Sequence, residues 1–162
     1  MLWLLPQMGR DVLEIYVDAD GCPVKEEVYR VAGRYGLKVW VVANGWLRVP
    51  DDPLVTRVTV GEGLDRADDW IAERIGSGDV AITADVPLAD RCVKRGARAI
   101  APAGRPFTEA SIGADLASRN LMTALREAGE IRGGGRPFTK QDRSRFLGAL
   151  DAAIQGIRKT GR

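Results

Sequence analysis

Apolar residues in the first two thirds of the chain alternate between short runs and segments with helical spacing. The short runs predict five β-strands, at residues 13–17, 37–43, 55–60, 79–84 and 97–101. Between them, apolar residues recur every three or four positions and predict helices over 23–35, over 64–75 and from the turn at 85–90 to Lys94 or Arg95. Because helices alternate with almost continuously apolar strands, we expect a three-layer α/β domain with a mainly parallel sheet of about five strands.

The last third of the chain has a different pattern, with two long amphipathic segments. These segments predict C-terminal helices over 112–128 and 139–158, separated by a glycine-rich stretch at 133–135. Thr139 and Asp142 have the spacing of a capping box at the start of the second helix. We therefore divide the chain into an N-terminal extension (1–12), a single domain (13–158) and a short tail (159–162).

Composition narrows the chemistry, mainly because the chain contains no histidine. This excludes Ser-His-Asp and Cys-His triads and every metal site that uses histidine. The cysteines, Cys22 and Cys92, lie seventy residues apart, so neither a zinc cage nor a disulfide framework is indicated and a cytoplasmic location is expected. The 162 residues, 45% of them apolar, fit one globular domain. The apolar start is interrupted by Pro6 and is too short for a membrane span.

Aspartates gather where the predicted strands end. Asp18 and Asp20 follow the first strand, and Asp85 and Asp90 follow the fourth. Three more share one face in the first turns of the helix after the third strand, at positions 65, 68 and 69. In open parallel sheets, ligands bind beyond the carboxyl ends of the strands, where the strand order reverses. If the first and fourth strands are neighbours there, these carboxylates converge and require a hard cation such as Mg²⁺ or Mn²⁺.

A site of this kind can activate water and stabilise the leaving oxygen of a phosphodiester, with two metal ions about 4 Å apart in its full form. The predicted metal ligands are Asp18, Asp65, Asp68, Asp69, Asp85 and Asp90. The predicted catalytic residues are Asp18, Asp20, Asp65, Asp69 and Asp85. Taken one at a time, each aspartate also has a structural interpretation, because aspartates are common in turns and at helix starts.

Charge is divided unevenly along the chain, although the net charge is only +2. Residues 126–162 carry a net charge of +5 and residues 1–125 carry −3. Cations beside the glycine-rich stretch suit the phosphate groups of a nucleic acid, and a solvated helix face is the alternative. Trp46 lies in a loop where its ring can stack on a base. The predicted nucleic-acid contacts, with RNA as the favoured partner, are Lys25, Asn44, Trp46, Arg48, Arg132, Arg136 and Lys140.

Five motifs follow one another in a characteristic order. They are Ile-Tyr-Val-Asp-Ala-Asp-Gly-Cys-Pro-Val-Lys at 15–25, Val-Ala-Asn at 42–44, Gly-Leu-Asp-Arg-Ala-Asp-Asp-Trp-Ile at 63–71, Thr-Ala-Asp-Val-Pro-Leu-Ala at 83–89 and Pro-Phe-Thr at 137–139. Together they resemble the YaiI/YqxD family of uncharacterised bacterial proteins, over roughly residues 13–157. That family is similar to PIN-like nuclease domains, whose acidic residues bind Mg²⁺ or Mn²⁺.

The resemblance implies a PIN-like fold and assigns roles to individual acids. Asp18 matches the acid at the end of strand one, and Asp85 matches the acid at the end of strand four. The acid on the middle helix is matched by Asp65 or by the pair at 68–69. Asp20 belongs to the family's Asp-Ala-Asp-x-Cys-Pro motif, in which Gly21 replaces the usual alanine and loosens the turn without touching a ligand.

Three functions compete on this evidence. The first is a metal-dependent nuclease that hydrolyses RNA or DNA. The second is a phosphatase, because the sequence at 17–21 resembles the start of haloacid-dehalogenase-type enzymes, with Asp18 as nucleophile and Asp20 as general acid. In this chain, however, Cys22 and Pro23 enter a helix at once and leave no room for the usual flap. The third is a non-catalytic RNA-binding or regulatory protein with an incomplete site.

Overall fold

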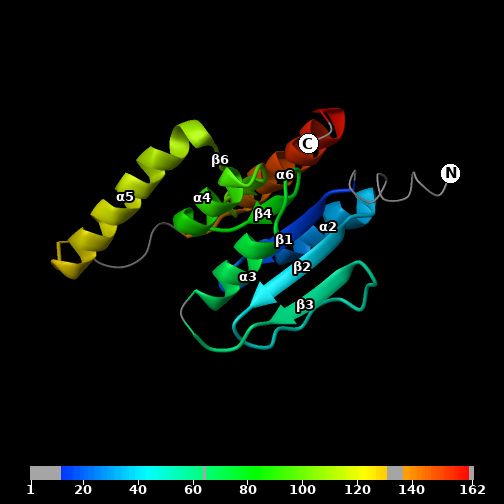
Figure 1. Cartoon of the computed structure of the whole chain (residues 1–162), viewed down its shortest axis with the longest axis horizontal. Helices are drawn as coiled ribbons and strands as arrows, with labels where there is room; N and C mark the ends of the chain where they lie inside the picture. The colour runs from blue at the N-terminus through cyan, green and yellow to red at the C-terminus, as the bar shows by residue number, and fades with distance from the viewer. Residues whose placement is uncertain (1–11, 64, 131–136, 161–162) are drawn as a thin grey trace.

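The computed structural model describes residues 12–63, 65–130 and 137–160, which form an α/β fold (Figure 1). Its elements follow the order β1 (Glu14–Asp18), α2 (Lys25–Tyr35), β2 (Lys38–Ala43), β3 (Val55–Thr59), α3 (Arg66–Arg74), β4 (Val80–Ile82), α4 (Val86–Lys94), β5 (Arg98–Ile100), β6 (Pro106–Phe107), α5 (Glu109–Glu127) and α6 (Lys140–Thr160). The five predicted strands are confirmed, each with ends within two residues of the prediction.

The strands form one sheet in the order β3-β2-β1-β4-β5-β6, parallel except for β6. Ile15 of β1 lies opposite Val39 of β2 on one side and opposite Val80 of β4 on the other. The chain first builds β2 and β3 on one side of β1 and then crosses to build β4 and β5 on the other. The strand order therefore reverses beside β1, and the first and fourth strands are neighbours, which was the condition for the carboxylates to converge.

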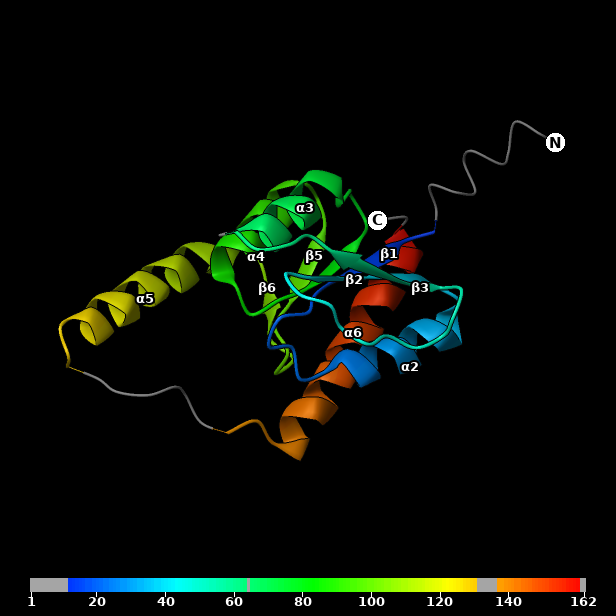
Figure 2. The same ribbon diagram turned by 90° about the horizontal axis from the view of Figure 1, so that it is seen from below.

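Helices cover both faces of the sheet, as Figure 2 shows. On one face, Ile15 and Val17 of β1 belong to a core that includes residues of α2 and α6, among them the fully buried Phe146. On the other face, Tyr16 belongs to a core that includes residues of α3 and α4. Neighbouring strand residues point to opposite faces, so this almost continuously apolar strand supplies both cores.

Helix α6 is held in place at its start by the predicted capping box. The Asp142 carboxylate accepts a hydrogen bond from the Thr139 backbone N–H at 2.9 Å, and the Thr139 hydroxyl accepts one from the Asp142 N–H at 3.1 Å. Further along, Arg143 donates a hydrogen bond to the Pro23 carbonyl at 2.6 Å. These contacts fix α6 beside the start of α2, on the side of the sheet where the loop after β1 emerges.

Two features differ from the sequence prediction. Strand β6 was not predicted, because it has two residues and begins with a proline, so it carries no periodic pattern. Helix α5 begins at Glu109, three residues before the predicted start, because Thr108 and Ser111 form a capping box.

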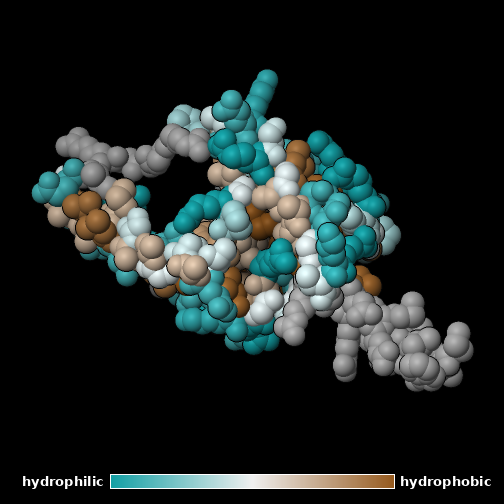
Figure 3. Space-filling view, turned by 90° about the horizontal axis from the view of Figure 1, so that it is seen from above, coloured by the Kyte–Doolittle hydropathy of each residue, from teal (hydrophilic) through white to brown (hydrophobic). Residues whose placement is uncertain are grey.

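Helix α5 packs on α4 near its start and then projects from the body, leaving Leu121 60% exposed. Apolar side chains gather along this helix at the left of Figure 3.

The described residues extend slightly past both predicted ends of the domain. Of the predicted extension at 1–12, only Val12 lies among the described residues, and α6 continues to Thr160, two residues into the predicted tail. Across the described ranges, no helix is both long enough and apolar enough to cross a membrane.

Candidate functional site

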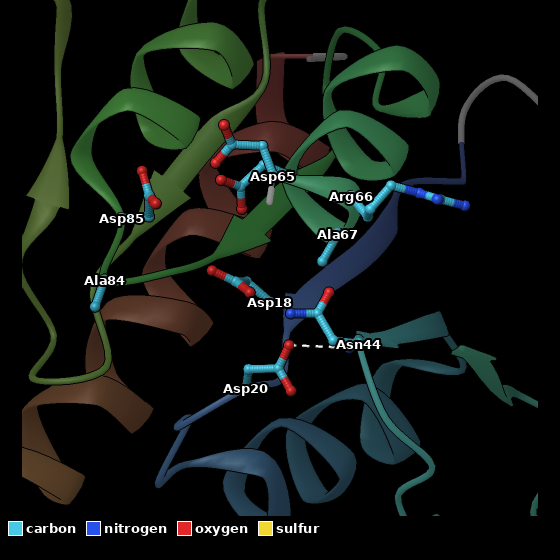
Figure 4. A pocket seen from close by; sticks show the side chains of 9 residues that line it. Asp18, Asp20, Asn44, Asp65, Arg66, Ala67, Ala84 and Asp85 are labelled. Atoms are coloured by element: carbon cyan, nitrogen blue, oxygen red, sulfur yellow. Dashed lines mark hydrogen bonds between the residues drawn. The ribbon is translucent and has the colours of Figure 1, made fainter. Parts of the chain in front are cut away.

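The carboxyl ends of β1, β2 and β4 open onto an acidic pocket of about 400 Å³ (Figure 4). Its lining side chains come from the loops after these strands and from the start of α3. They are Asp18, Asp20, Asn44, Asp65, Arg66, Ala67, Asp68, Ala84 and Asp85. The structure thus brings five of the predicted aspartates together at the point where the strand order reverses.

Thr83 connects the Asp18 carboxylate with the backbone of Asp85, at the carboxyl ends of β1 and β4. It follows β4 directly and is only 1% exposed. Its hydroxyl donates a hydrogen bond to Asp18 Oδ2 at 2.7 Å and accepts one from the Asp85 backbone N–H at 2.9 Å. Asp85 in turn caps α4, because its Oδ1 accepts a hydrogen bond from the Leu88 N–H at 3.0 Å. One buried hydroxyl therefore fixes the Asp18 carboxylate relative to the start of α4.

Asp20 joins the loops after β1 and β2. Its Oδ2 accepts a hydrogen bond from the Asn44 backbone N–H at 3.0 Å, drawn as a dashed line in Figure 4. The Asn44 side-chain amide extends toward Asp18 in the same view. Asp20 therefore has a structural role in holding Asn44 at the pocket.

Asp65 has an unusual backbone conformation at the start of α3. Its φ is +62°, in the left-handed region, and it is the only residue other than glycine with a positive φ in the part of the chain that the structure describes. Aspartate tolerates this conformation better than most residues, and such conformations concentrate at functional sites. Although it occupies the N-cap position, its side chain makes no capping hydrogen bond and lines the pocket instead.

Burial and repulsion raise the pKa values of two of these aspartates. The pKa of Asp68 is raised to about 6, first by burial and then by the charges of Asp85, Asp18 and Asp65. A side-chain hydrogen bond with Asp85 also favours the protonated form of Asp68. The pKa of Asp18 is raised mainly by burial, while the hydrogen bond from Thr83 acts in the opposite direction and the charge of Asp85 adds to the rise. The pocket therefore carries negative charge that its own side chains do not balance.

The donor set of the pocket fits a hard divalent cation. Its aspartates and the Asn44 amide supply oxygen ligands, which Mg²⁺ and Mn²⁺ prefer. Arg66 also borders the pocket but directs its guanidinium away from the carboxylates (Figure 4). Among the described residues, no three Asp, Glu or Cys side chains form a ready-made metal site. Because Mg²⁺ often uses one or two carboxylates and keeps several of its waters, the residues suit a hydrated cation.

Asp69 and Asp90, also predicted as ligands, do not line the pocket. Asp69 follows Asp68 in α3, and successive helical side chains point about 100° apart, so only one of the pair faces the other carboxylates. Asp69 forms an ion pair with Arg91 at 2.7 Å, and Asp90 forms one with Lys94 at 2.8 Å. Both aspartates therefore belong to surface ion pairs, which contribute little to stability.

The predicted nucleic-acid contacts fall into two groups. Asn44 lines the acidic pocket, whereas Lys25 and Arg48 line a second cleft of about 360 Å³. Trp46 lies between Asn44 and Arg48 in sequence and is 66% exposed. Lys140 is exposed at the start of α6, and the predicted contacts at positions 132 and 136 lie outside the described residues.

Comparison with known proteins gives matches to a family model and to individual sequences. The model of a family described as "Uncharacterized BCR, YaiI/YqxD family" matches residues 16–156. The chain belongs to the YaiI/YqxD family. A UPF0178 protein of Rhodopseudomonas palustris (strain BisB18) is 62% identical over 148 residues, which cover 91% of this chain and 96% of the relative. A UPF0178 protein of Nitrobacter winogradskyi is 63% identical over 147 residues, covering 91% and 94%. No solved structure matches the chain.

These comparisons confirm the family predicted from the motifs, and that family is described only as uncharacterised. The names of these relatives state no activity, so the function of this YaiI/YqxD protein has to be argued from its own pocket.

Sequence reasoning missed Thr83 as a site residue. The signal was available, because a hydroxyl residue ends the otherwise apolar run at 80–82, directly before the pocket. It also missed Arg57 of β3, whose guanidinium carbon lies 4.8 Å from the centre of the Trp46 ring. That contact joins residues eleven positions apart in different segments, and no local pattern indicates it.

Proposed function

We propose that this protein hydrolyses phosphodiester bonds in nucleic acid, preferably RNA, with Mg²⁺ or Mn²⁺ held by the acidic pocket. The observation that supports this most directly is the convergence of Asp18, Asp68 and Asp85 from three separate elements, with the pKa of Asp68 raised to about 6. Uncompensated carboxylates at the reversal of a parallel sheet are costly to maintain, and a cation with a phosphate ligand would balance them. The absence of histidine from the chain leaves oxygen ligands as its means of holding such a cation.

Five residues at or beside the pocket have distinct parts in this proposal. Asp18 and Asp85 hold the cation, which when bound supplies an activated water and stabilises the leaving oxygen. Thr83 keeps the Asp18 carboxylate in place through its 2.7 Å hydrogen bond. Asn44 presents its amide to a non-bridging phosphate oxygen. Asp68, whose pKa is raised to about 6 by burial and by the neighbouring carboxylates, loses its proton when the cation binds and then serves as the general base toward water.

Calorimetric titration with Mn²⁺ tests the metal site directly. Asp18→Asn and Asp85→Asn should each weaken Mn²⁺ binding by about tenfold or more, since even loss of an indirect partner of a metal costs about 10- to 100-fold. Asp69→Asn is the matched control, because Asp69 lies on the same helix as Asp68 but pairs with Arg91 outside the pocket. If all three variants bind Mn²⁺ like the parent protein, the metal site is wrongly assigned.

Hydrolysis is tested with a labelled RNA oligonucleotide and a DNA oligonucleotide of the same sequence. We expect cleavage that requires Mg²⁺ or Mn²⁺, stops with EDTA and is lost in Asp85→Asn but retained in Asp69→Asn. Binding of RNA without any cleavage would instead support a non-catalytic role. The phosphatase interpretation is less favoured, because α2 begins at Lys25 and leaves only a short turn after Asp20 for a flap. Detection of an acyl phosphate on Asp18 would instead support the phosphatase interpretation.

A further inference from the structure

The segment 44–50 begins at the acidic pocket with Asn44, bends at 44–45 and then continues without regular secondary structure. Along it, Leu47 and Val49 are partly buried and pack against the core, while Trp46 and Arg48 are exposed. Buried and exposed side chains therefore alternate over 46–49, and the two buried ones anchor the segment to the core. The exposed pair is thus displayed by a fixed backbone.

The Trp46 ring is exposed but is held by a contact with a neighbouring strand. The Arg57 guanidinium from β3 lies over its ring, with the guanidinium carbon 4.8 Å from the ring centre, yet Trp46 remains 66% exposed. A cation on an aromatic face stabilises the ring in one orientation. A large aromatic surface kept exposed and oriented in this way suits stacking of a nucleic-acid base.

A cleft of about 360 Å³ lies further along the same segment and carries two cations. Lys25, Arg48 and Tyr29 line it, together with Glu26, Val49 and Pro50. Lys25 and Arg48 favour an anion there and Glu26 opposes one, so the charged residues of the cleft leave a net positive charge. This charge suits pairing with a single phosphate group.

We infer that residues 44–50 form a track for an unpaired nucleic-acid strand that leads into the acidic pocket. A base stacks on Trp46, and a neighbouring phosphate enters the cleft at Lys25 and Arg48. Trp46 follows Asn44 by two residues, a separation of at most about 7 Å, which corresponds to about two nucleotides of a stacked strand. This inference rests on the proposed function for the direction of the strand, and it narrows the substrate class to single strands.

Selection against duplexes follows from the same geometry. A base within a duplex is already stacked on both faces and cannot lie on Trp46 without being unpaired. An unpaired base can, and stacking tolerates any base, so sequence preference should be weak. RNA and DNA strands share the required base faces and phosphates.

Binding is measured by fluorescence anisotropy in EDTA, where no hydrolysis interferes. The probes are labelled oligouridine, labelled oligodeoxythymidine and a blunt duplex RNA. We expect both single strands to bind more tightly than the duplex, and their relative affinities show whether RNA or DNA is preferred. Trp46→Ala should weaken single-strand binding about 5- to 150-fold without changing its salt dependence. Leu121→Ala, at another strongly exposed apolar residue, is the matched control and should bind like the parent.

Arg48→Ala gives a second, different readout. Loss of one phosphate contact should reduce the slope of log affinity against log salt concentration by about 0.7. Equal affinity for duplex and single strand, or unchanged binding in Trp46→Ala, would overturn the track.

The two proposals fail separately in these assays. Binding that depends on Trp46 without any Mn²⁺-dependent cleavage would support the track and contradict the phosphodiesterase activity. Mn²⁺-dependent cleavage that is unaffected by Trp46→Ala would support the phosphodiesterase activity and contradict the track.

Discussion

Replacing Thr83 by valine tests whether one hydroxyl organises the acidic pocket. Valine has nearly the same shape as threonine, so the replacement deletes the hydrogen bonds and preserves the packing. Two bonds are lost, the one donated to Asp18 at 2.7 Å and the one accepted from the Asp85 N–H at 2.9 Å. Because Thr83 is 1% exposed, water cannot easily replace the hydroxyl.

The expected loss of stability can be worked from these two bonds. A hydrogen bond to an ionised group contributes about 1.5–3 kcal/mol, and a buried N–H without an acceptor costs about 1–3 kcal/mol. Both bonds belong to one hydroxyl and their costs overlap, so we expect a loss of about 2–3 kcal/mol in the free energy of unfolding. With a denaturant slope of about 2 kcal/mol per molar urea, the unfolding midpoint falls by about 1–1.5 M.

Urea unfolding of the parent and of two variants measures this. Thr59→Val is the matched control, because Thr59 is exposed in β3, and its effect should lie within about 0.5 kcal/mol. The loss in Thr83→Val should shrink at acid pH, since the hydroxyl bond stabilises the ionised form of Asp18 and holds its pKa down. Equal effects of the two replacements at neutral pH would refute the role given to Thr83.

Three further predictions concern the Asp68 charge, two glycines and the basic C-terminal arm, which is defined as residues 126–162 with their net charge of +5. Because the pKa of Asp68 is raised to about 6 in the fold, the native state holds more protons than the unfolded chain between about pH 4 and pH 6, and stability falls as pH rises through that window. Asp68→Asn should therefore raise the melting temperature at neutral pH and have little effect below about pH 4. Gly104→Ala should cost more than about 1 kcal/mol in urea unfolding, because φ is +97° and a Cβ would lie 2.6 Å from a backbone carbon of α6. Gly33→Ala, in the open interior of α2, should instead stabilise by about 0.5–1 kcal/mol. Neutralising the arm should weaken RNA binding and flatten its salt dependence while leaving Mn²⁺ affinity nearly unchanged, when measured on the triple variant of Arg132, Arg136 and Lys140. An unchanged salt slope would mean that the arm is only a solvated surface.

The sequence predicted the parts of the fold that depend on local pattern. Strands β1 to β5 are apolar runs flanked by turns, and the alternation with helices implies a parallel sheet. The sequence alone left open whether β1 and β4 are neighbours, and the sheet order shows that they are. Strand β6 could not be predicted in this way, because two residues cannot show a period and only pairing with β5 makes them a strand.

The sequence predicted which helices and strands form the candidate site, but not which of their side chains reach it. The spacing of positions 65, 68 and 69 places three carboxylates near one face of a helix, but it does not determine how the helix is rotated against the sheet. That rotation is set by the packing of Ala67 and Ile71 on the core, and it brings Asp68 to the pocket and Asp69 to Arg91. Asp90 lies outside the pocket for a similar reason, since it pairs with Lys94 four residues later in its own helix.

The chemistry available at this end of the sheet depends both on the absence of histidine from the chain and on the clustering of aspartates in the pocket. A protein without histidine has no side chain whose ordinary pKa lies near neutrality. Asp68 becomes such a side chain, because burial and the charges of Asp85, Asp18 and Asp65 raise its pKa to about 6. The same repulsion among the carboxylates would favour cation binding and loss of the Asp68 proton together, since a cation favours the ionised carboxylate. If the pocket binds a cation as proposed, binding and proton release are therefore two consequences of one electrostatic repulsion.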